Sequence, residues 1–121
     1  MKRSMMQIYV KGSVEAVEFY QKAFSARLGF NGKNDKGEYI HAELDVYGQT
    51  LAISEGVRKS GEQMQFCLHF YSDERNNVKK AYDVLKEGAL KIDQPPGACM
   101  FSPYMTSLID KFGIYWCLWI D

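Results

Sequence analysis

The residues of this chain best suited to acid–base chemistry are its two histidines and a glutamate close to the first of them. His41 and Glu43 are two residues apart in a segment of alternating polarity, so a strand there places both side chains on one face. His69 takes a polar position in a second segment of this kind. An imidazole titrates near neutral pH, so His41, Glu43 and His69 are the candidate catalytic residues. The same groups could instead only bind a ligand.

Polar side chains alternate with apolar ones throughout the predicted strands. The predicted ligand-binding set consists of Gln7, Tyr9, His41, Glu43, Gln65, Cys67, His69 and Cys117. A sheet face this polar suits the lining of a pocket better than a core. The sequence has no GxSxG, GxGxxG, Walker or HExxH motif, and no glycine-rich loop for S-adenosylmethionine follows a predicted strand. Serine hydrolase, dinucleotide, nucleotide and methyltransferase chemistry therefore have no local signature.

The elements that carry these residues occur twice along the chain. Residues 8–54 predict strand, helix, hairpin and strand, and residues 65–119 repeat that order. The clearest echo pairs Tyr47-Gly48-x-x-Leu51 with Phe112-Gly113-x-x-Trp116. Two halves of this size are too small to bury good separate cores. We therefore expect an α+β fold in one domain, 1–121, with βαβββ repeats at about 5–54 and 64–120 forming a curved half-open barrel around a cavity.

The strand pattern also assigns faces. The apolar positions of two predicted strands, Ile40, Ala42, Leu68 and Phe70, are expected to face the helices. Both histidines and Glu43 are then expected to face one shared cavity.

Ser13 is expected to cap the first helix, and Asp93–Pro103, which contains Pro95-Pro96-Gly97, is expected to be an irregular loop. Open sheets leave edges that must be covered, and the first and last strands are rich in apolar residues, so a homodimer is expected.

Composition narrows the partners. The chain has 121 residues, and its fifteen basic side chains balance fifteen acidic ones, which argues against a nucleic-acid partner. No apolar run approaches the roughly 20 residues of a membrane span, and no signal peptide is predicted. Three cysteines without CxxC spacing favour neither a disulfide scaffold nor structural zinc. We expect a cytoplasmic protein without membrane partners.

Four short motifs occur in order along the chain. They are Ala16-Val17-Glu18-Phe19-Tyr20-x-x-Ala23-Phe24, His41-Ala42-Glu43-Leu44, Leu85-x-x-Gly88-Ala89 and Asp110-Lys111-Phe112-Gly113-x-x-Trp116. Together they resemble the vicinal oxygen chelate superfamily, which includes glyoxalase I, bleomycin-resistance proteins and extradiol dioxygenases. More narrowly, the chain is similar to the PhnB-like branch. Lys111 departs from that branch, which usually has proline there.

The resemblance implies a metal site in some relatives, with one ligand on the first and last strand of each half. Those positions fall at about Met5, Ala52, Gln65 and Cys117, and none is His, Asp or Glu. A different register would bring Gln7 or His69 into them. Mismatched amide and thiol donors do not hold a hard octahedral ion, so we expect no metal ligand and no cofactor.

The sequence and the resemblance together imply a PhnB-like protein that binds a small organic molecule in the cavity between its repeats, without the usual metal. The alternative is a lyase, isomerase or dioxygenase-type enzyme that uses His41, Glu43 and His69, with or without metal assistance. Cys117 as a nucleophile has no supporting signal in the sequence. The ligand's identity is not encoded in any motif.

Overall fold

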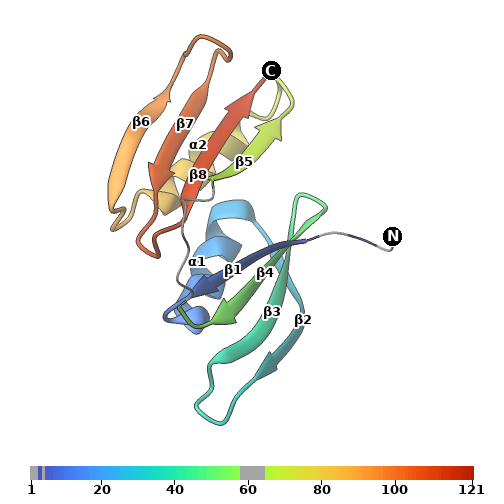
Figure 1. The fold of residues 1–121 in the computed structure, drawn as a ribbon. Helices are drawn as coiled ribbons and strands as arrows, with labels where there is room; N and C mark the ends of the chain where they lie inside the picture. The colour runs from blue at the N-terminus through green and yellow to red at the C-terminus, as the bar shows by residue number, and fades with distance from the viewer. Residues whose placement is uncertain (1–2, 4, 58–64) are drawn as a thin grey trace. The chain divides into compact units, whose positions relative to one another are not determined.

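The structure is a computed structural model that describes residue 3 and residues 5–57 and 65–121 (Figure 1). The side chain of Gln65 lies outside this description. The chain divides into two compact units, Met1–Lys59 and Ser60–Asp121.

The first unit follows the predicted order of elements, βαβββ. It contains β1 (Met6–Val10), α1 (Ser13–Phe24), β2 (Arg27–Lys33), β3 (Tyr39–Val46) and β4 (Gln49–Glu55). Its sheet has the strand order β1-β4-β3-β2, in which β1 runs parallel to β4 and the other pairs are antiparallel. We call it sheet 1.

The second unit repeats this topology. Its elements are β5 (Gln65–Phe70), α2 (Arg75–Leu85), β6 (Lys91–Gly97), β7 (Met105–Ile109) and β8 (Tyr115–Ile120). The strand order of its sheet, sheet 2, is β5-β8-β7-β6, with β5 parallel to β8. The predicted α+β class and the repetition of the βαβββ unit are confirmed. Among the described residues, no helix has the length and apolar character needed to cross a membrane.

One helix packs on one face of each sheet and forms the core there (Figure 1). In the first unit, Val17, Tyr20 and Phe24 of α1 are buried, together with Leu44 and Ile53 of the sheet. The buried residues of α1 recur at helical spacing, and Leu44 and Ile53 are at apolar positions of strands that alternate with polar ones. The burial therefore follows the apolar pattern of the sequence. In the second unit, α2 contributes the buried side chains of Val78, Ala81 and Leu85.

A glutamate from a distant strand caps α1 in place of the expected serine. Glu55 accepts hydrogen bonds from the backbone N–H groups of Gly12 (3.0 Å) and Ser13 (2.8 Å). Gly12 is the N-cap, with φ 86°, a conformation that glycine adopts without strain. The Ser13 hydroxyl instead accepts the backbone N–H of Tyr39 at 2.9 Å. The prediction that Ser13 caps the helix was therefore wrong.

Two further predictions were wrong: the inward facing of Ile40 and the irregular structure of the whole segment Asp93–Pro103. Ile40 is 63% exposed, because a register shift near Gly32 and Lys33 turns Tyr39 into the core in its place. Ala42 and Phe70 are buried as predicted, and Leu68 is half-buried.

The first part of the expected loop Asp93–Pro103 belongs to β6. Proline is tolerated there since β6 is an edge strand, where a missing N–H breaks no interior ladder.

Candidate functional site

The face of sheet 1 opposite α1 gathers the polar residues of three strands. Residues that pair directly across neighbouring strands share a face, so the register identifies them. Gln7 pairs with Ala52, which pairs with Glu43, and Tyr9 pairs with Ser54. Because side chains alternate along β3, His41 lies on this face with Glu43. We call this surface the polar face of sheet 1; it is defined by Gln7, Tyr9, His41, Glu43, Asp45, Thr50, Ala52 and Ser54.

The central feature of the polar face is a hydrogen-bonded cluster of His41, Glu43 and Arg3. His41 Nε2 lies 2.8 Å from Glu43 Oε2. The Arg3 guanidinium binds the same carboxylate through both terminal nitrogens, with Nη1 at 2.9 Å from Oε1 and Nη2 at 3.1 Å from Oε2. Hydrogen bonding from Arg3, and secondarily from His41, holds the pKa of Glu43 below its usual value. Glu43 is therefore an anion at neutral pH.

This ionised carboxylate determines which nitrogen of the His41 ring carries the proton. A carboxylate can only accept hydrogen bonds, so the proton of this contact lies on His41 Nε2. In the neutral imidazole, Nδ1 is then the atom with a lone pair that can accept a proton. The His41 side chain is 28% exposed and that of Glu43 is 13% exposed, so a small molecule can reach the ring more readily than the carboxylate.

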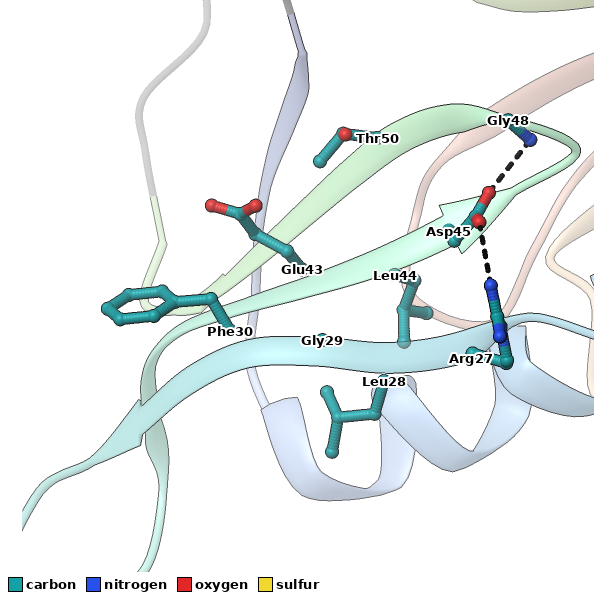
Figure 2. Close-up of a pocket in the computed structure, with 9 residues that line it drawn as sticks. All are labelled: Arg27, Leu28, Gly29, Phe30, Glu43, Leu44, Asp45, Gly48 and Thr50. Atoms are coloured by element: carbon teal, nitrogen blue, oxygen red, sulfur yellow. Dashed lines mark hydrogen bonds and ion pairs between the residues drawn. The ribbon is translucent and has the colours of Figure 1, made fainter.

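A groove of about 390 Å³ opens beside Glu43 (Figure 2). Glu43 and Thr50 project from the side of the sheet opposite α1, whereas Leu28 and Leu44 project towards the helix. At one end of the groove, Arg27 pairs with Asp45 at 3.6 Å. The described residues that line the groove all belong to the first unit and are Arg27, Leu28, Gly29, Phe30, Glu43, Leu44, Asp45, Gly48 and Thr50.

An irregularity in β2 places an aromatic ring next to this cluster. Leu28 pairs with Leu44 and Asn31 pairs with Ala42, so Gly29 and Phe30 together oppose the single residue Glu43. Such a bulge turns a side chain away from regular alternation. The Phe30 ring, 73% exposed, consequently lies 6.1 Å from the His41 ring between centroids. Strand alternation alone would have assigned Phe30 to the face of Leu28.

Several residues of this site were not predicted from the sequence, among them Arg3, Arg27, Phe30 and Thr50. Gly29 beside an aromatic residue in a predicted strand was the one available signal, because glycine within a strand often marks a bulge. Arg3 precedes β1, and its partner Glu43 is 40 residues further along the chain. No local pattern marks such a contact.

The other predicted residues of the first unit stand beside the cluster. Gln7 is half-buried and donates its side-chain amide to Ser54 Oγ at 3.1 Å and to the backbone carbonyl of Ile8 at 3.0 Å. Tyr9 is half-buried on the same face. Both residues therefore lie on the polar face as predicted, with Gln7 engaged in local hydrogen bonds.

His69 belongs to the second unit and is held by two neighbours. Its Nε2 lies 2.6 Å from Asp121 Oδ1, and its ring stacks on Trp119 with centroids 4.9 Å apart. Phe101 meets the same Trp119 edge to face at 5.9 Å. The His69 side chain is 53% exposed, so the ring is accessible.

Two of the predicted binding residues are cysteines at neighbouring positions on adjacent strands of sheet 2. Cys67 on β5 pairs directly with Cys117 on β8. Cys67 is exposed and Cys117 is buried. Burial, with a smaller contribution from Cys67, raises the pKa of the Cys117 thiol to about 11. Cys117 is therefore a neutral thiol at physiological pH and a poor nucleophile, since the thiolate is the reactive form.

The side chains at the positions implied for a metal do not suit a hard divalent ion. The resemblance implies positions at about Met5, Ala52, Gln65 and Cys117. The register instead pairs Ala52 with Gln7 and Cys117 with Cys67 on the first and last strands of the two units. The four paired residues are therefore Gln7, Ala52, Cys67 and Cys117. These side chains offer one amide, one methyl group and two thiols. Hard divalent cations require several carboxylate, carbonyl or water oxygens. Across residues 3, 5–57 and 65–121, no group of three or more His, Cys, Asp or Glu side chains is placed to hold a metal ion.

Comparison with known proteins assigns this arrangement to a class. The repeated βαβββ unit is shared by solved structures over nearly the whole chain. The PhnB protein from Bacillus cereus has a TM-score of 0.81 at 20% identity, covering 99% of this chain and 100% of that one. Protein PA1353 from Pseudomonas aeruginosa has a TM-score of 0.79 at 18% identity, covering 100% and 98%. The fosfomycin resistance protein FosX from Listeria monocytogenes has a TM-score of 0.71 at 16% identity, covering 97% and 91%.

The fold is therefore that of the vicinal oxygen chelate proteins, PhnB-like members among them. The family model for the Glyoxalase/Bleomycin resistance protein/Dioxygenase superfamily matches residues 3–118, and the chain belongs to this superfamily. No curated protein matches the sequence. The resemblance stated from four sequence motifs is thereby confirmed.

Proposed function

We propose that this protein binds a small organic molecule on the polar face of sheet 1 and does so without a divalent metal. The observation that carries the proposal is the fixed His41–Glu43 pair beside a groove that also exposes Phe30. Small-molecule sites combine apolar and aromatic surface with a few fixed polar groups. The groove offers both.

The rigidity of the cluster supports binding. Arg3 and His41 both hydrogen-bond to Glu43, so the carboxylate keeps one orientation before a ligand arrives. Groups that are already ordered lose less conformational entropy when they bind. Phe30, which is 73% exposed, adds apolar area beside the His41 ring. The predicted contributions of Gln65, Cys67, His69 and Cys117 from the second unit remain predictions.

The proposal is tested by a fragment screen monitored by ¹H–¹⁵N NMR, together with native mass spectrometry of freshly purified protein. We expect bound compounds to shift the amide signals of residues 27–30 and 43–50. Phe30→Ala should weaken the best compound at least tenfold. Tyr71→Ala is the matched control, because Tyr71 is an equally exposed aromatic residue (75%) in the second unit. Binding that is unaffected by Phe30→Ala and by Glu43→Gln would contradict the proposal.

A second candidate function is catalysis by the same pair. Glu43 orients the His41 ring through its contact with Nε2, while Nδ1 can take a proton from a bound molecule. This arrangement suits a lyase or isomerase step that begins with proton abstraction; a dioxygenase-type reaction would need an oxygen-activating group in addition. The test follows each bound compound in D₂O by NMR. Deuterium incorporation or product formation that His41→Gln abolishes, with binding retained, supports catalysis, whereas an unchanged ligand supports binding alone.

A further inference from the structure

We propose that the groove selects an organic cation, a guanidinium or ammonium group on an apolar body, and that Arg3 competes with this ligand for Glu43. The inference rests on the proposed binding function and adds the charge class of the ligand and a built-in competitor. It follows from three features: where Arg3 binds, how charge is distributed in the groove, and how the two side chains are exposed.

Arg3 already makes the contacts expected of a bound cation. Its guanidinium forms a two-pronged pair with Glu43, and its Nη1 also donates to Thr50 Oγ1 at 3.3 Å. Glu43 and Thr50 both line the groove. The cationic group of Arg3 is therefore held at the rim of the groove by two of its lining residues. A fork-shaped cation matches a carboxylate in geometry as well as charge.

One carboxylate that lines the groove, Glu43, pairs with a cation that is not itself a lining residue. Among the residues that the structure describes, Arg27, Glu43 and Asp45 are the charged ones that line the groove. Arg27 pairs with Asp45, so these two compensate each other. The counter-charge of Glu43 comes from Arg3, which reaches it from the segment before β1. A ligand in this groove that displaces Arg3 must bring a positive charge, or it leaves a mostly buried carboxylate without its counter-ion.

The exposure of the side chains favours exchange of Arg3 while Glu43 stays in place. The Arg3 side chain is 49% exposed, against 13% for Glu43. Because the Arg3 side chain is half-exposed, a cation from solution can take its place on the carboxylate, and the incoming charge offsets the loss of this ion pair. His41 continues to donate to Oε2 when Arg3 leaves. Phe30 then provides an aromatic face for the apolar body of the ligand or for its cation.

The test uses three probes that share a benzyl group and differ in charge: benzylguanidine, benzyl alcohol and phenylacetate. Affinities are measured by NMR titration on the wild-type protein and on Arg3→Ala, Glu43→Gln and Lys36→Ala. Lys36 is an exposed residue in the turn after β2, so its removal changes net charge as Arg3→Ala does without touching the groove. Circular dichroism verifies that each variant is folded.

We expect benzylguanidine to bind at least tenfold more tightly than either other probe. Because Arg3 occupies the carboxylate in the free protein, Arg3→Ala should tighten benzylguanidine binding about two- to fivefold. Glu43→Gln should weaken it at least tenfold, and Lys36→Ala should change it by less than twofold.

Each other result overturns the inference in a recognisable way. If benzyl alcohol or phenylacetate shifts the groove residues as strongly as the cation, the charge class is wrong and the binding function still stands. If Arg3→Ala weakens the cation, Arg3 is part of the ligand site and not a competitor. If no probe binds to the wild type or to Arg3→Ala, the inference is rejected, while the broader fragment screen independently decides the binding function.

Discussion

The indole of Trp116 donates its Nε1–H to Asp110 Oδ2 at 2.8 Å, and both side chains are fully buried in the second unit. Asp110 Oδ1 accepts the backbone N–H groups of Phe112 and Ile114 at 2.9 and 3.0 Å. One carboxylate therefore organises the turn from β7 to β8 and fixes the largest aromatic ring of the core. Because these donors satisfy it, this polar group can lie in an apolar interior.

Asp110→Ala should destabilise the protein, since it leaves the indole N–H and two backbone N–H groups without this acceptor. A buried donor that loses its partner costs about 1–3 kcal/mol. Urea unfolding followed by tryptophan fluorescence measures the change. Asp73→Ala removes an exposed carboxylate from the same unit and is the control, expected within about 0.5 kcal/mol of wild type. A loss no larger than that of the control would contradict the assigned role.

Glu55 should make stability depend on acid pH. Hydrogen bonds from the backbone N–H of Ser13, and then of Gly12, lower the pKa of Glu55 in the folded protein. A carboxyl with a depressed folded pKa stabilises the protein above its unfolded pKa, about 4.3, and this stabilisation is lost as pH falls through the folded pKa. Glu55→Gln should therefore cost stability at pH 7, about 0.5–2 kcal/mol as for other helix caps.

The same variant should cost much less at pH 2, where Glu55 is protonated in the wild type as well. Urea titrations at both pH values measure the difference. Glu18→Gln changes an exposed glutamate on α1 and serves as the control. Equal losses at pH 7 and pH 2 would show that the charge of Glu55 does not cap the helix.

Cation binding in the groove should resist mild acid. Because Arg3 and His41 lower the pKa of Glu43, this carboxyl stays ionised between pH 7 and pH 5. Benzylguanidine affinity should therefore show no loss from Glu43 protonation in that range, and it should fall only below the ordinary glutamate pKa of about 4.3. NMR titrations at pH 7, 5 and 3.5 measure this. In Glu43→Gln the loss on going from pH 5 to 3.5 should disappear.

The facing cysteines should differ in reactivity. In the native protein at pH 7.5, N-ethylmaleimide should modify the exposed Cys67 well before Cys117, which is buried and has a thiol pKa raised to about 11. Peptide mass spectrometry identifies the labelled site at each time point. Cys117 should become reactive in 6 M guanidinium chloride, which removes the burial. Equal labelling of both thiols in the native protein would refute the assignment.

The predicted homodimer remains a prediction, and one of its grounds needs correction. Trp116 is buried beneath α2, and β8 lies inside its sheet, so the last strand is not an exposed apolar edge. Met5, just before β1, is 40% exposed, and β1 is at the edge of sheet 1. Light scattering should give about twice 13.9 kDa at micromolar concentration, lowered by Trp119→Asp. A mass of one chain would exclude the dimer under these conditions.

The sequence by itself determined the repeated βαβββ order and most of the core, because period-two and helical apolar patterns are local properties. It also placed His41 and Glu43 on one face, since any strand brings alternate residues together. It allowed four motifs to identify the superfamily, which the family comparison then confirmed.

Only the tertiary structure decided what surrounds that pair. The bulge at Gly29 and Phe30, the inward turn of Tyr39 and the outward turn of Ile40 depend on register between strands. The pairing of Arg3 with Glu43 and the capping of α1 by Glu55 join residues about 40 positions apart. Such contacts form because folding brings distant segments into register, and a pattern within one segment holds no information about its partner.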